Sequence, residues 1–165
     1  VDAAKGLASE KVKASELEFG YQVDVRYHGQ GLRLTVDVDL KLEPDRDEIL
    51  RAIPRLKEEL ETNVELASPD GFLPELPGWR DRSPFVAREG LVTFRHYDFY
   101  AQALAKVERG HARDLADVAA MLDRGLVLPA RLRELHAAIE PLLYRFPAVD
   151  PPTLRSALEA ALAGR

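Results

Sequence analysis

An eleven-residue run with strict alternation, LRLTVDVDLKL at 32–42, constrains the fold of this chain most strongly. Every second position of the run is apolar, and the positions between are polar or charged. Because successive side chains of a strand point to opposite faces of a sheet, the pattern predicts a strand with one apolar, buried face. The other face then carries Asp37 and Asp39, although carboxylates are unfavourable in strands and are rarely buried.

Two interpretations of this aspartate pair stay open. Side chains two positions apart along a strand lie roughly 6–7 Å from each other at Cβ, so Asp37 and Asp39 repel each other unless a cation lies between them. Mg²⁺ is a suitable cation, because it takes oxygen ligands and is commonly held by one or two carboxylates plus substrate phosphates. The alternative is an ordinary solvated strand face, on which Arg33 and Lys41 screen the charge.

The segments next to this strand indicate strands in the first part of the chain. A short helix is expected at 2–16, followed by a strand at 17–28 and a turn at 29–31, which would form a hairpin with the alternating strand. A helix is expected at about 46–62, and Pro54 should kink or restart it. This helix has one apolar face, formed by Ile49, Leu50, Ile53, Leu56 and Leu60.

The middle of the chain combines a short strand, a long loop and a hairpin. The strand is expected at 63–67, and the loop at 68–84 contains four prolines and two glycines. Loops of this length in compact domains are usually functional or packed by their own side chains. We expect Trp79 to be the packing anchor of the loop, and a second hairpin to turn at Glu89-Gly90.

The last part of the chain reads as helical, so that strands precede helices and the fold class is α+β. Helices are expected at 97–109, 111–124 and 129–143, with Gly125 ending the second. A last helix should begin with Asp150 as N-cap and Pro151 in the first turn. The expected buried positions are Tyr100, Leu104, Val107, Leu115, Val118, Ala119, Leu122, Leu132, Leu135, Ile139, Leu142, Leu154, Leu158 and Leu162.

Composition narrows the classes of function. The length of 165 residues suggests one domain. A net charge of −5 argues against broad nucleic-acid binding. A nucleic-acid acceptor such as tRNA therefore has no support from the charge of the chain. No run approaches the roughly 18 apolar residues of a membrane span. The absence of cysteine excludes disulfides, thiolate metal ligands and cysteine nucleophiles, and suits a cytoplasmic protein.

Glu65 is a further candidate for the same surface as the aspartates. If the strand at 63–67 neighbours the alternating strand, Glu65 supplies a third carboxylate. Two Mg²⁺ ions held by such a group can activate an attacking hydroxyl and stabilise a leaving phosphate oxygen. The alternative is an ordinary exposed glutamate.

A second charged group lies in the helical part. Lys106 and Arg109 are three residues apart and share a helical face, and Asp114 and Asp117 follow with the same spacing. One interpretation places the two cations at a triphosphate, held in position by the aspartates. The other is a surface network between two helices.

Several motifs together resemble a known family. They are TVDVDLKLEP, AIPRLKEELETNVELASPDGFLPELPGWRDRSPFV, HYDFYAQALAKVERGHARDLADV, RGLV and IEPLLYRFPAVDP, within about residues 35–155. This part of the chain resembles the nucleotidyltransferase superfamily, in its AbiEii-like group. Members transfer a nucleoside monophosphate from a nucleoside triphosphate to an acceptor, or are inferred to, and many belong to toxin–antitoxin or phage-defence pairs.

The resemblance implies a nucleotidyltransferase-like mixed sheet within 1–96, with an atypical N-terminal segment at 1–34, and a helical C-terminal part of the same domain at 97–165. It implies that Asp37 and Asp39 bind Mg²⁺. It also implies that Glu65 is a third ligand or the base for the attacking hydroxyl, and that Lys106 and Arg109 bind the phosphates of the nucleotide.

The N-terminal segment departs from this family. Residues from about 10 to 38, with the pattern D-x-R-Y-x-G-Q, are similar to a hydantoinase/oxoprolinase segment, and they lack the Gly-Gly or Gly-Ser turn that cradles triphosphate. A second hypothesis therefore stands beside the enzyme: a catalytically inactive interaction module with this fold, from a recombinant or engineered chimera. It would bind a protein partner, or itself as a homodimer.

Overall fold

The computed structural model describes residues 20–24, 37–42, 47–60, 63–90 and 92–164, without the side chains of 20–24, 37–38, 48 and 60. The predicted helix at 2–16, the turn at 29–31 and the first half of the alternating strand lie outside these residues. The chain divides into a sheet unit, Val1–Ser68 with Ser83–Tyr97, and a helical unit, Pro69–Arg82 with Asp98–Arg165. The predicted α+β class is confirmed.

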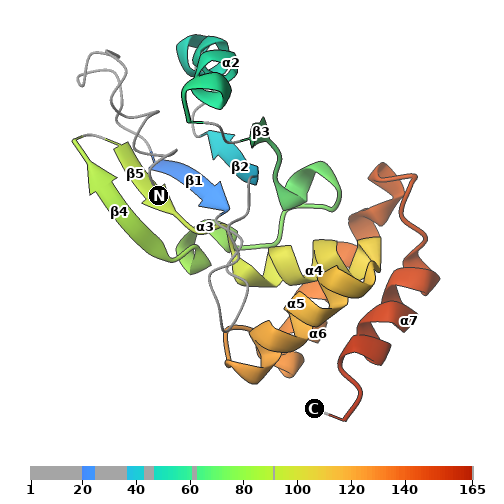
Figure 1. Cartoon of the computed structure of the whole chain (residues 1–165). Coiled ribbons are helices and arrows are strands. Elements are labelled where there is room, and N and C mark those ends of the chain that lie inside the picture. The colour runs from blue at the N-terminus through green and yellow to red at the C-terminus, as the bar shows by residue number, and fades with distance from the viewer. Residues whose placement is uncertain (1–19, 25–36, 43–46, 61–62, 91, 165) are drawn as a thin grey trace. The chain divides into compact units, whose positions relative to one another are not determined.

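A mixed sheet of five strands forms the centre of the sheet unit. Its strands are β1 (Gly20–Asp24), β2 (Asp37–Leu42), β3 (Asn63–Leu66), β4 (Phe85–Glu89) and β5 (Val92–Arg95). Their order is β3-β2-β1-β5-β4 (Figure 1). The β1–β2 and β4–β5 pairs are antiparallel, which confirms the two predicted strand pairings, whereas β1–β5 and β2–β3 are parallel.

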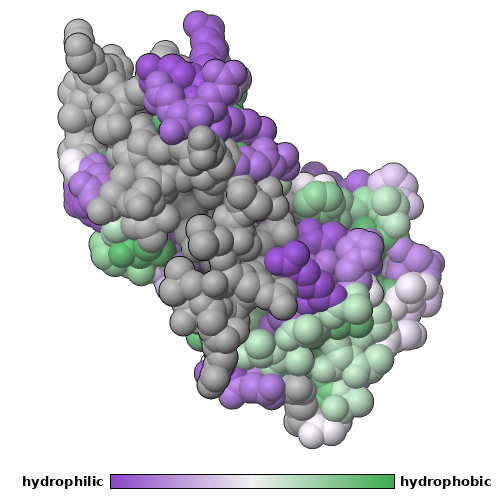
Figure 2. Space-filling model, in the orientation of Figure 1, coloured by the Kyte–Doolittle hydropathy of each residue, from purple (hydrophilic) through white to green (hydrophobic). Residues whose placement is uncertain are grey.

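Helix α2 (Asp47–Leu60) supplies the helical part of the sheet-unit core. Ile49 and Leu56 are buried and belong to one cluster with Leu40, Leu42, Val64, Val92 and Phe94 of the sheet. The outward surface of α2 is hydrophilic (Figure 2). The helix continues through Pro54 without restarting, because Pro54 lies on the exposed side, where water can replace the lost backbone donor.

Both faces of β2 are covered. Leu40 and Leu42 are buried, as the alternation predicts, but Asp39 on the opposite face is only 8% exposed. The neighbouring Lys41 is partly buried, with its ammonium 5.8 Å from the centre of the Tyr97 ring. The interpretation of this strand face as fully solvated is therefore wrong at Asp39, because alternation of residue types reports polarity and not the layer that covers it.

The predicted hairpin at Glu89-Gly90 is confirmed. β4 ends at Glu89 and β5 begins at Val92. Gly90 has a φ of +61°, a conformation that a glycine adopts without the strain of a Cβ atom. The register of β4 against β5 shifts between Phe85 and Ala87, so the outer strand is irregular at its start.

The Pro-rich loop belongs to the helical unit and is packed by its own side chains. It contains the 3₁₀ turn η2 (Pro69–Gly71) and the short helix α3 (Trp79–Arg82). Trp79 is 2% exposed, which confirms it as a packing anchor, and Leu73 and Leu76 are buried as well.

An ion pair joins this loop to the first long helix of the unit. Arg82 donates from Nη2 to Asp98 Oδ2 at 2.6 Å and from Nε at 3.2 Å. Asp98 is fully buried, and its Oδ1 accepts from the backbone N–H of Tyr100 at 3.1 Å. Asp98 therefore caps the helix and holds α3 against its start.

Four helices and a second 3₁₀ turn complete the helical unit. They are α4 (Phe99–Arg109), α5 (Ala112–Asp123), α6 (Pro129–Ile139), η3 (Glu140–Arg145) and α7 (Pro151–Ala161). Asp150 caps α7 by accepting from Thr153 N at 3.0 Å, with Pro151 next to it, as predicted. Gly125 follows α5 with a φ of +67°, also as predicted.

Two predicted core positions are wrong. Leu115 is 38% exposed and Leu142 is 39% exposed, whereas Leu143 is only 1% exposed. The α-helical spacing that selects Leu142 ends at Ile139, where the chain tightens into η3 around Pro141. Positions three and four residues after a helical residue both lie on its face, so spacing from Ile139 did not decide between Leu142 and Leu143.

Candidate functional site

The sheet brings acidic residues into register on three neighbouring strands. Asp39 of β2 pairs with Glu65 of the parallel strand β3, and on its other side with Asp24 of the antiparallel strand β1. Adjacent strands lie about 4.8 Å apart, and positions in register belong to the same face of a sheet. We call this set of three positions the carboxylate row.

The side chains of the row that the structure describes differ in exposure. Asp39 is 8% exposed, whereas Glu65 is exposed. Glu65 Oε1 accepts a hydrogen bond of 2.8 Å from the amide Nδ2 of Asn63, the neighbour on the same face of β3. This neutral donor orients the Glu65 carboxylate without neutralising its charge.

Asp37 lies two residues before Asp39 on β2, at the next position on the same face. It is the first residue of β2 and pairs with Asn63, while its side chain lies outside the description. The condition set for Glu65 is met, because its strand β3 pairs with the aspartate strand β2. Among the side chains that the structure describes, no group of three or more histidine or acidic residues is placed to hold a metal ion.

Asp24 is the position that the sequence did not single out. Its strand is only partly alternating, in LEFGYQVDVRYH, so nothing in the local pattern marks Asp24 as different from Asp37 or Asp39. The sequence predicts the hairpin, but the strand register depends on the length of the turn, which sequence alone specifies poorly. Counting the carboxylates on both strands of the expected hairpin could have identified Asp24 as a candidate.

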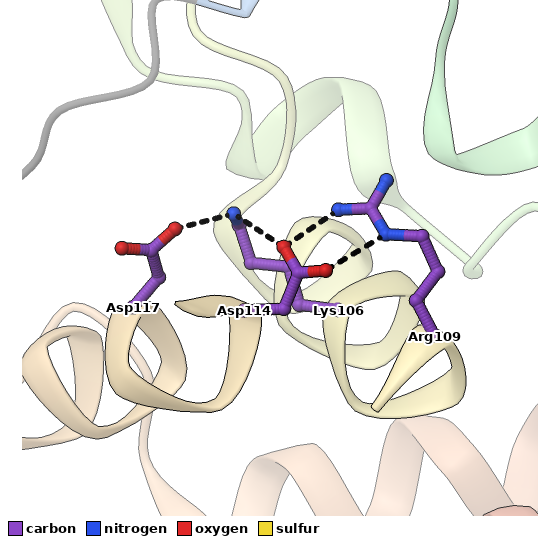
Figure 3. A network of polar contacts seen from close by, with 4 residues as sticks. All are labelled: Lys106, Arg109, Asp114 and Asp117. Carbon is purple, nitrogen blue, oxygen red and sulfur yellow. Dashed lines mark hydrogen bonds and ion pairs between the residues drawn. The ribbon is translucent and has the colours of Figure 1, made fainter. Parts of the chain in front are cut away.

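The second group, Lys106, Arg109, Asp114 and Asp117, forms a network between α4 and α5 (Figure 3). Lys106 Nζ lies 2.7 Å from Asp117 Oδ2 and 3.4 Å from Asp114 Oδ1. Arg109 donates to both oxygens of Asp114, from Nη2 at 2.9 Å and from Nε at 3.1 Å. Two cations and two carboxylates therefore balance in formal charge.

Local structure explains why these four side chains meet. Gly110 ends α4 with a φ of +67°, and its N–H bonds back to the carbonyl of Lys106. Only His111 then separates it from α5, so the end of α4 and the start of α5 lie next to each other. The network joins these two ends.

Burial separates this network from a surface ion pair. Lys106 is 6% exposed and Asp114 is 8% exposed, so the interpretation as an exposed surface network is wrong for these two residues. Burial by itself raises the pKa of Asp114, but the hydrogen bonds and positive charges of Arg109 and Lys106 outweigh it. The pKa of Asp114 therefore lies below its ordinary value.

The two groups belong to different units of the chain. Asp39 and Glu65 lie in the sheet unit, and Lys106 and Arg109 lie in the helical unit. The structure brings together Asp39 with Glu65, and separately Lys106 with Arg109.

Comparisons with protein-family models, with curated proteins and with solved structures returned no match for this chain. Within the described ranges, no helix has the length and apolar character needed to cross a membrane.

Proposed function

We propose that the chain is a Mg²⁺-dependent nucleotidyltransferase that transfers a nucleoside monophosphate from a nucleoside triphosphate to an acceptor. The observation that supports this proposal is the register of the carboxylate row, in which Asp39 and Glu65 are neighbours on parallel strands. Like charges directly opposite each other destabilise a sheet. A divalent cation bound between them would offset that cost.

The proposed chemistry follows from the charges. Asp37 and Asp39 would hold Mg²⁺, which would supply positive charge to the phosphate oxygens of the nucleotide. An acceptor hydroxyl would attack the α-phosphorus, the bond to the β-phosphate would break, and pyrophosphate would leave. Glu65 would be a third metal ligand, or would take the proton of the hydroxyl, because it is exposed and can reach a substrate.

The predicted role of Lys106 and Arg109 at the phosphates becomes a weaker part of the proposal. Both cations have buried or partly buried carboxylate partners in Asp114 and Asp117, and an anionic ligand would have to compete with them. We propose that the pair mainly holds α4 to α5. Nucleotide affinity should then change only through the stability of the helical unit when Lys106 is replaced.

The experiment is calorimetric titration of the protein with Mg²⁺ and each nucleoside triphosphate, followed by transfer assays with α-labelled nucleotide. The test variants are Asp39→Ala and the double variant Asp37→Ala/Asp39→Ala. Glu58→Ala, an exposed glutamate on α2, is the control. We expect loss of Mg²⁺-dependent binding in the test variants and not in the control. No Mg²⁺-dependent binding by the wild-type protein, or unchanged binding in the double variant, would refute the proposal.

The second candidate function is the inactive interaction module. The charge balance of the network supports it, because the cations predicted to bind phosphate are already paired. A ligand that binds only the folded state must raise its stability. No thermal shift at millimolar Mg²⁺ plus nucleotide, together with self-association in analytical ultracentrifugation, would favour the module over the enzyme.

A further inference from the structure

His136 is a buried histidine in the helical unit that the proposed function does not use. It lies in α6 and is 4% exposed, and its Nε2 is buried without a hydrogen-bond partner. Most buried side-chain nitrogens have a partner, and leaving one unsatisfied costs stability. A buried, unpaired imidazole nitrogen therefore requires an explanation.

Two ion pairs flank this histidine and join α6 and η3 to α7. Arg133 Nη2 lies 2.8 Å from Glu159 Oε2, and Arg155 Nε donates to Glu140 Oε1 at 2.9 Å. Arg133 and Glu140 lie three residues before and four residues after His136, on the same helical face. The imidazole thus lies between two links from α6 and η3 to α7.

The charges that act on His136 come from η3 and α7. Glu140 and Glu159 favour its protonation and Arg155 opposes it, but burial has the largest effect and lowers the pKa of His136 below its ordinary value. Helix α4 also packs against α6. Its described cations Lys106 and Arg109 are bound to the aspartates of α5.

We propose that His136 is an acid-operated switch that holds α7 in place when neutral and releases it when protonated. Opening exposes the imidazole to water, so that its positive charge no longer has to be buried. Helix α7 packs against α4 and α5 (Figure 1). Its release would therefore uncover the helices that carry the Lys106–Asp114 network.

The direction of the effect follows from proton binding. The opened state takes up a proton near the ordinary pKa of about 6.5, whereas the packed state binds it only at lower pH. The packed state is therefore fully stabilised above about pH 6.5 and loses stability as the pH falls. Each unit by which burial lowers the pKa corresponds to about a tenfold change in the opened population.

The test is amide hydrogen exchange of the full chain at about pH 7 and about pH 5, either side of the ordinary histidine pKa, with intrinsic rates corrected. We expect peptides of Pro151–Ala161 to exchange faster at the lower pH, by about tenfold per unit of lowered pKa. Peptides of β2 and β3 are the internal reference. His136→Gln and His136→Phe should abolish the acceleration, and His111→Gln, at an exposed histidine, should retain it.

Two outcomes would overturn the switch. One is equal protection of α7 at both pH values in the wild-type protein, and the other is an acceleration that persists in both His136 variants. If neither variant folds, the ring proton signals of His136 in the wild-type protein decide the question. A titration midpoint at or above about 6.5 contradicts the proposal, and one below it supports the proposal.

Discussion

The sheet unit and the helical unit differ in how their charged residues are arranged. In the sheet unit, Asp24, Asp39 and Glu65 place the same charge in register across three strands. In the helical unit, Lys106 and Asp114 are opposite charges in direct contact and are both buried. The first arrangement places acidic residues at neighbouring positions of adjacent strands, and the second pairs opposite charges directly.

This difference indicates which group is suited to a ligand and which to stability. A set of like charges gains most when a cation arrives, because each carboxylate is then stabilised by it. A balanced buried network has little to gain from a ligand and much to lose when one member is removed, because the remaining charges stay buried. Sequence motifs alone treat both groups as equal candidates for a binding site.

The largest expected effect is that of Asp114→Asn. It leaves Arg109 without its carboxylate partner and Lys106 with Asp117 alone, and we expect a loss of about 3 kcal/mol in the free energy of unfolding. Trp79 is the single tryptophan and is buried in the helical unit, so its fluorescence in urea reports this unit. A loss below about 1 kcal/mol would mean that the network behaves as a surface pair.

Much of the secondary structure follows from local sequence patterns. The alternation at 37–42, the apolar face of α2 and the Asp150–Pro151 start of α7 each depend on residues that are close in sequence. The core leucines Leu154, Leu158 and Leu162 follow from their spacing alone. These features are local, so the sequence was sufficient to predict them.

What the sequence missed has two causes, which are spacing that fits two neighbouring positions and contacts between distant residues. Leu142 and Leu143 both fit the helical spacing from Ile139, and only Leu143 is buried. Asp39 follows the polar half of the alternation, yet it is buried, because tertiary structure covers that face. The place of Asp24 in the carboxylate row depends on strand register, which a one-residue slip would change.

The second prediction concerns Mg²⁺ at the carboxylate row. At a tenfold excess over its dissociation constant, a ligand that binds only the folded state stabilises it by about 1.4 kcal/mol. We therefore expect amides of β2 and β3 to exchange about tenfold more slowly with Mg²⁺. Glu65→Gln should reduce this protection without lowering stability in the absence of metal, because it removes one of the like charges. Glu58→Gln on α2 should retain it.

A loss of stability in Glu65→Gln without metal would contradict the proposed difference between the carboxylate row and the helical network. If the variant loses stability without metal, Glu65 contributes to a favourable pairing in the free protein. The carboxylate row would then stabilise the free protein, as the helical network does.

The third prediction concerns acid. Because the folded-state pKa of Asp114 is lowered, its contribution to stability is complete above about 3.8 and is lost as the pH falls through the lowered value. The loss is about 1.4 kcal/mol per unit of lowered pKa. It should be measured by Trp79 fluorescence in a His136→Gln background, which removes the histidine step at higher pH. The double variant His136→Gln/Asp114→Asn should lack this loss of stability in acid. If the double variant loses the same amount of stability, a group other than Asp114 is responsible.

The smallest effect should come from an exposed ion pair in the same unit. Arg131 and Glu134 lie 2.7 Å apart on α6, but their side chains are 47% and 63% exposed. We expect Glu134→Gln to cost no more than about 0.5 kcal/mol, and less at high salt, because water and ions screen an exposed pair. The pair is closer than the contact between Lys106 and Asp114, so distance alone would rank it higher. A cost similar to that of Asp114→Asn would therefore show that burial is not what separates the two kinds of ion pair.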